Sequence, residues 1–197
     1  MVACAAVLLV VIIGAVFIFA GGNNPETILK RYLIGAMSQD FNALTKYSAY
    51  DFDNLIKEVY TAEGLTEKEF NQRLYSELKV KNLKELFDEK AREALIDLRK
   101  QYGSDYKTSF EIIDSSPVKQ SEITNKIASL QSFFERNDYD GSKIIRLDKI
   151  TEMIECEVEA AIKGSKDEDI DYIKIIMVKI AGKWRILDDI NQFTRMF

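Results

Sequence analysis

Apolar and polar residues alternate most regularly near the C-terminus, between Ile150 and Asp189. From Ile154 onward one row of alternate positions is wholly apolar, and the other is polar at all but one position. Side chains of a strand point alternately to its two faces, so this pattern predicts a strand with one buried and one acidic face. The buried row is Ile154, Cys156, Val158, Ala160 and Ile162, and the other row is Glu155, Glu157, Glu159, Ala161 and Lys163.

Two further strands are predicted to complete an antiparallel meander. A polar turn at 164–169 leads into residues 170–180, which carry apolar side chains on both faces, as a more central strand would. A short turn at 181–183 then leads into a last strand at 184–187. The acidic row of the first strand is interpreted as a solvated face that discourages edge pairing, and contact with a basic partner is the alternative.

The residues before residue 105 show helical spacing. Asn24 is the expected N-cap of a first helix, because proline and an acidic residue follow it in the first turn. Shorter helical segments follow at 41–47 and 51–60. Two capping pairs, Thr66 with Glu69 and Asn82 with Glu85, then predict the starts of two more helices. The second of these helices is the longest and is expected to end at Gly103.

The period changes near residue 106. Residues 106–113 alternate and predict the first strand, and Ser121 is the expected cap of a helix that follows it. Residues 143–149 are either a short strand or the lead-in to the meander. Helices followed by a helix-interrupted antiparallel sheet of about four strands predict an α+β fold.

An uncharged apolar run precedes all of these elements. Val2 to Ala20 is broken only by Gly14, and at about 1.5 Å per residue it spans roughly 28 Å, close to the thickness of a bilayer core. A secretory signal is the first alternative, but its apolar core is usually shorter, and Ile18 stands where a cleavage site needs a small residue. A buried core helix is the second. We expect residues 1–23 to be a transmembrane anchor and residues 24–197 to be one domain.

Composition removes several classes of function. The chain has 197 residues and a net charge of -5, and it lacks a basic stripe, which argues against binding nucleic acid. It contains no histidine, which excludes Ser-His-Asp and Cys-His catalysis and histidine-based zinc sites. Catalysis through carboxylates, lysine or tyrosine stays open.

The remaining chemical candidates have plainer interpretations. Cys4 lies in the apolar run and Cys156 in the buried row, where it serves as a small core side chain. Asp138, Asp140 and Gly141 imitate part of a calcium loop, but Arg136 and Leu147 occupy two of its ligand positions, so a turn is the better interpretation. Asp171 and Asp188 suit solvated strand ends. We therefore predict no catalytic, cofactor-binding or metal-binding residues, and no cofactor.

Three short segments resemble the nuclear transport factor 2-like superfamily, a cystatin-like cone in which a bent antiparallel sheet curls around N-terminal helices. They are Pro25-Glu26-Thr27, Gln39-Asp40-Phe41 and the closing hairpin Ile180–Leu187 with its Gly-Lys-Trp turn. The resemblance covers roughly residues 24–37 and 105–190. Residues 50–102 exceed the usual stretch between the family's helices and are interpreted as a helical insertion.

The resemblance also implies a place and a role. Similar bacterial proteins are held outside the membrane by one N-terminal helix, and some serve as scaffolds in secretion and conjugation. We expect a non-catalytic, single-pass, extracytoplasmic binding or scaffold domain of a Gram-positive-type envelope. Its partner is another protein or a small apolar ligand in the cone. The alternative is an isomerase- or cyclase-type enzyme that uses carboxylate or tyrosine groups there.

Overall fold

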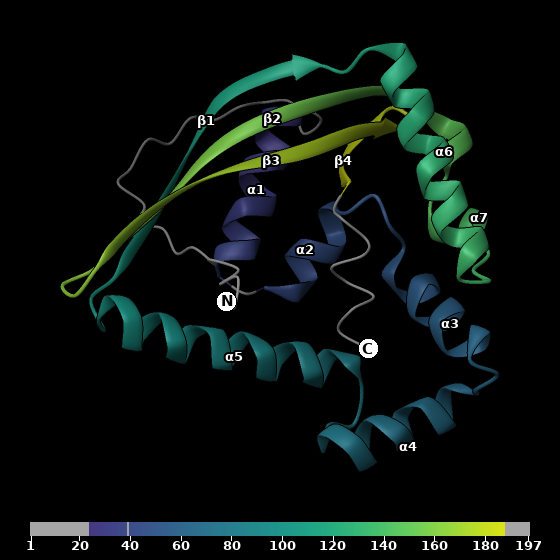
Figure 1. Ribbon diagram of the computed structural model, residues 1–197, viewed down its shortest axis with the longest axis horizontal. Helices are drawn as coiled ribbons and strands as arrows, with labels where there is room; N and C mark the ends of the chain where they lie inside the picture. The colour runs from purple at the N-terminus through teal and green to yellow at the C-terminus, as the bar shows by residue number, and fades with distance from the viewer. Residues whose placement is uncertain (1–23, 39, 188–197) are drawn as a thin grey trace.

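The computed structural model describes residues 24–38 and 40–187, which form an α+β fold (Figure 1). The predicted combination of helices with a four-stranded antiparallel sheet is confirmed. The elements are α1 (Pro25–Met37), α2 (Phe41–Tyr47), α3 (Phe52–Ala62), α4 (Glu67–Leu78), α5 (Leu83–Tyr102), β1 (Lys107–Pro117), α6 (Gln120–Arg136), α7 (Gly141–Ile144), the 3-10 turn η1 (Leu147–Lys149), β2 (Ile150–Lys163), β3 (Glu168–Ile180) and β4 (Lys183–Leu187).

The predicted membrane anchor at 1–23 lies outside the described residues. Within 24–38 and 40–187, none of the helices combines the length and the apolar character that crossing a bilayer requires. Residues 52–102 are mainly helical, as expected for 50–102, and comprise α3, α4 and α5.

The four strands follow one another in the sheet in the order β1-β2-β3-β4, and each neighbouring pair is antiparallel. The predicted meander of three strands is therefore confirmed. The turn between β3 and β4 places Ala181 and Gly182 at φ values of 48° and 79°. Two successive positive φ angles match the twist of antiparallel strands, which makes this a tight hairpin.

One face of the sheet packs on α1 and forms the main core. Figure 1 shows β1, β2 and β3 arching over α1. The predicted buried row of β2 lies on this concave face, although Ile154 is only partly buried. In this core, Leu29 of α1 has no exposed surface, and neither do Val158, Met177 and Ile186 of the sheet.

The opposite face of the sheet is covered by α6 at one end. Met153 lies on this face just before the predicted polar row, and it is buried with Val178 and Ile123 of α6. Glu155, Glu157 and Glu159 of the same row are half-buried. The polar character of this face therefore ends at Glu155, because the helix that follows β1 folds back over Met153.

Side-chain caps begin most of the helices where the sequence placed them. The Asn24 carboxamide accepts a hydrogen bond from the Glu26 N–H at 2.9 Å, and the capping box of Thr66 and Glu69 is complete. Asn82 caps α5 through the Glu85 N–H. The Glu85 carboxylate accepts from the Lys81 N–H. These bonds satisfy backbone groups that a helix start leaves unpaired.

Two local expectations need correction. The α6 helix begins at Gln120 without a side-chain cap, so Ser121 lies inside its first turn. The backbone N–H of Val118 bonds to the Met153 carbonyl at 2.9 Å, which holds the chain on the sheet until just before the helix. Residues 143–149 form no strand, because α7 and η1 occupy most of them, so the lead-in interpretation holds.

Replacing Leu29 with alanine tests the main core. Leu29→Ala leaves a cavity between α1 and the sheet, and it is expected to lower the free energy of unfolding by about 2–5 kcal/mol. The control is Ile96→Ala on α5, where the side chain is 50% exposed, with an expected change within about 0.5 kcal/mol. Urea denaturation measures both. Equal losses in the two variants would contradict the assigned core.

Candidate functional site

The concave face of the sheet offers little room or chemistry for a ligand. Its side chains pack directly on α1, with Leu29, Val158 and Met177 fully enclosed. Among the described residues the buried polar side chains other than tyrosine are Ser48, Glu58 and Thr108, and of these Thr108 lies in the concave row opposite Ile162. Tyr102 is buried in the same core, and its hydroxyl accepts a hydrogen bond from the Gln101 amide. The Thr108 hydroxyl has no hydrogen-bond partner. A lone threonine supplies neither a base nor an acid near neutral pH.

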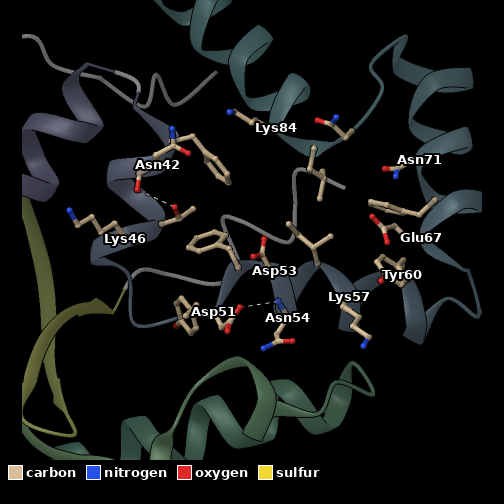
Figure 2. A pocket seen from close by; sticks show the side chains of 18 residues that line it. Asn42, Lys46, Asp51, Asp53, Asn54, Lys57, Tyr60, Glu67, Asn71 and Lys84 are labelled. Carbon is tan, nitrogen blue, oxygen red and sulfur yellow. Dashed lines mark hydrogen bonds between the residues drawn. The ribbon is translucent and has the colours of Figure 1, made fainter.

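An open groove of about 830 Å³ lies elsewhere, between α2, α3, α4 and the beginning of α5. Figure 2 shows side chains from these four helices converging on it. We call its apolar lining the groove floor: Phe41, Phe52, Ile56, Tyr60, Phe70 and Leu83. A volume of this size falls within the range of pockets that bind small molecules or peptide side chains.

Aromatic contacts hold the groove floor together. Phe41 of α2 stacks on Phe87 of α5 with 4.5 Å between ring centroids, and it meets Phe52 of α3 edge-on at 6.0 Å. Tyr60 and Phe70 pack with their centroids 5.7 Å apart. Aromatic rings in such arrangements stabilise the fold by more than the area they bury would predict. The floor is therefore a fixed surface that joins the helices.

The edge of the groove is lined by amide and charged side chains. We call the groove rim the set Asn42, Asp53, Lys57, Asn71, Asn82 and Lys84. Figure 2 shows Asp53 on α3 and Lys84 above it in the view, across the groove. Among the described residues, Lys57 and Lys84 take part in no ion pair, so their charges face solvent.

A buried glutamate fixes the position of α3, which forms one wall of the groove. The Glu58 carboxylate accepts hydrogen bonds from the Asp140 N–H at 2.9 Å and from Lys143 Nζ at 3.0 Å. Lys143 also pairs with the Asp140 carboxylate at 3.1 Å. Because burying a carboxylate is costly unless its oxygens are bonded, these contacts tie α3 to the α6–α7 connection.

We call the contacts of Glu58 with Asp140 and Lys143 the clip, and the pKa values of Asp140 and Lys143 are shifted away from neutral pH. Hydrogen bonds from Ser142 and then Lys143 lower the pKa of Asp140, and hydrogen bonds to Glu58 and then Asp140 raise the pKa of Lys143. Burial raises the pKa of the neighbouring Tyr139 hydroxyl. Asp140 and Lys143 therefore carry opposite charges across the physiological range.

The residues that sequence reasoning weighed for chemistry are not brought together. Burial raises the pKa of the Cys156 thiol, which suits its predicted place in the core. Asp140 begins α7 and pairs with Lys143, and Asp171 is exposed on β3. Asp188 lies outside the described residues. Within 24–38 and 40–187, acidic and cysteine side chains form no cluster that could hold a metal ion.

The sequence did not point to the groove. The floor residues Phe41 and Phe70 carry the spacing of an ordinary core face, and so they were interpreted as packing residues. An available signal was the density of asparagines between residues 42 and 82, at Asn42, Asn54, Asn71 and Asn82. Each amide side chain carries both a hydrogen-bond donor and an acceptor, which can bond a polar ligand.

Comparison of the chain with models of known protein families, with curated proteins and with solved structures finds no match. The resemblance to the nuclear transport factor 2-like superfamily therefore stays a prediction.

Replacing Lys143 with methionine tests the clip. Lys143→Met leaves Glu58 buried without its cation, so the urea midpoint at pH 7 is expected to fall. The control is Lys90→Met, which removes an exposed pair with Glu93 on α5 and is expected to change the midpoint little. Equal shifts in the two variants would contradict the clip.

The same variant has an expected pH dependence. The pKa of Asp140 is lowered from 3.8 in the folded protein. Its contribution to folding stability is therefore present above that value and is lost as the pH falls through the lower folded pKa. The pKa of Lys143 is raised from 10.5, so its contribution is present below that value and is lost as the pH rises through the folded pKa. The fall in urea midpoint caused by Lys143→Met should therefore be larger at pH 7 than at pH 3.

Proposed function

We propose that this protein is a non-catalytic binding or scaffold domain, held at the membrane by residues 1–23, with its globular part outside the cytoplasm. The observation that carries the binding role is the groove, with its aromatic floor and amide rim, beside a concave face that is filled by core side chains. Ligand binding is thus assigned to the helices. The anchor rests on the apolar run at 2–20.

The chemistry of the groove favours an extended segment of a partner protein. The floor accepts apolar or aromatic side chains, whereas a wholly apolar ligand would leave the rim amides without partners. An extended backbone presents N–H and C=O groups that need bonds, and the amides of Asn42 and Asn71, with the NH2 group of Asn82, offer partners for them. Asn42 lies on α2, Asn71 lies on α4 and Asn82 immediately precedes α5, so the three amides reach the groove from three elements.

The alternative, an isomerase- or cyclase-type enzyme, receives no comparable support. Such chemistry needs an acid or base inside a cavity with a shifted pKa. The buried carboxylate of the described region, Glu58, is bonded to a backbone N–H and to Lys143. It serves to fix α3.

Labelling with a membrane-impermeant maleimide tests the anchor and its orientation. Ser129 is exposed on α6, so Ser129→Cys in the full chain is expected to react in intact cells. The parent chain, whose Cys156 is buried, gives the background. Reaction only after lysis would place the domain in the cytoplasm. Deletion of residues 2–20 is expected to release the chain from the membrane fraction, and an unchanged fraction would refute the anchor.

Filling the groove tests the binding role. Peptides selected from a random displayed library against the full chain in lipid nanodiscs are expected to carry apolar side chains. Asn71→Trp fills the groove from α4 and should weaken their binding by about tenfold, or 1.4 kcal/mol. Ser76→Trp is the control, because Ser76 lies on the same helix and outside the groove lining. Failure to select peptides, or equal binding by both variants, would refute a peptide-binding groove.

A further inference from the structure

The outer face of the sheet, which points away from α1, is covered by α6 at one end alone among the described elements. There Ile123 of α6 lies over Met153 and Val178. Farther along the strands, large apolar side chains stand in solvent. Ile113 of β1 is 49% exposed, and Ile170 and Tyr172 of β3 are 57% and 59% exposed. Exposed apolar side chains gathered on one face indicate a contact surface.

The strand register places these side chains close to one another. Glu159 of β2 stands between Glu111 of β1 and Tyr172 of β3, and in the next outward row Ala161 faces Ile170. Ile113 lies at the bulge where the register of β1 shifts. We call this the outer patch: Glu111, Ile113, Glu157, Glu159, Ile170 and Tyr172. It lies on the groove-free side of the molecule, since strand residues do not line the groove.

Two of the three glutamates of the outer patch, Glu111 and Glu159, have no lysine or arginine opposite them in the strand register, whereas Glu157 stands opposite Lys174. Glu111 and Glu159 face each other across the β1–β2 pair, an arrangement of like charges that lowers stability. Lys174 pairs with Glu155 at 2.8 Å. Within the described ranges, Glu111, Glu157 and Glu159 form no ion pair, and Glu159 accepts a hydrogen bond from the Tyr172 hydroxyl at 2.8 Å. A cationic partner would relieve the repulsion that the strands alone sustain.

We propose that the outer patch docks a basic amphipathic helix of a partner protein. Its aliphatic stripe would cover Ile113, Ile170 and Tyr172, and its flanking lysines or arginines would meet the glutamates. The same face already packs a helix, since Ile123 and Ile127 of α6 contact it at the Met153 end. The partner helix therefore extends an existing layer. An anionic lipid surface is disfavoured as the occupant by the row of glutamates.

Photo-crosslinking from the patch tests this docking. The full chain in phosphatidylcholine nanodiscs carries Tyr172→benzoylphenylalanine, and the control carries Tyr75→benzoylphenylalanine on α4, where the tyrosine is 58% exposed. The probe is a synthetic helix of about 18 residues, or about five turns, made of leucine and lysine with all leucines in one stripe. A second peptide of the same composition spreads its leucines around the helix.

The expected result is cross-linking of the striped peptide from position 172, with a yield about tenfold above that from position 75 and above that of the spread peptide. Glu111→Gln with Glu159→Gln should lower this yield by about tenfold, while leaving the thermal midpoint equal or higher, because it removes a pair of facing like charges. Equal yields from both positions or both peptides, cross-links to a second copy, cross-links to residues 1–23, or no cross-link would each overturn the proposal. These outcomes leave the groove test unaffected, because the two surfaces share no residue.

Discussion

The rest of the fold depends on strand β2, which lies inside the sheet with both edges paired and one face packed on α1. Its two edges are paired with β1 and β3 along almost their whole lengths. Its concave face meets α1 through residues such as Val158, and at the Met153 end its other face meets α6. Backbone groups of an enclosed strand have no access to water, so both ladders must be complete. The positions of β1, β3, α1 and α6 are set by their contacts with this strand.

Sequence reasoning found the elements whose signals are local. The alternation of 154–163, the turn at Gly182 and the capping box at Thr66 each depend on neighbouring residues, and each was located correctly. It missed what distant segments create together. Met153 lies just before the predicted polar row and is buried because α6 returns over it, and Glu58 looks like a surface acid until Lys143 reaches it. The groove needs four helices, and no single stretch contains it.

The two proposed contact surfaces differ in how they relate to stability. The groove floor belongs to the packing between helices, because Phe41 and Phe70 contact neighbouring rings. Changes there are expected to alter both folding and binding. The outer patch lies above a sheet that is already complete, so its side chains can change with little effect on the fold. A scaffold built in this way can acquire new specificity on the sheet while its helical site stays fixed.

The strand register also sets an order of assembly during synthesis. Pairs of the β2–β3 hairpin are close in sequence, from Lys163 with Glu168 outward, whereas β1 pairs Lys107 with Lys163 across a long loop. Contacts that close long loops form late, because the chain loses conformational entropy before these contacts stabilise it. Among the described elements, β2 to β4 are synthesised after every α-helix. Leu29 and Leu33 of α1 therefore lack their sheet contacts until the last strands emerge. The newly made N-terminal half is therefore expected to expose the apolar face of α1 until synthesis nears its end.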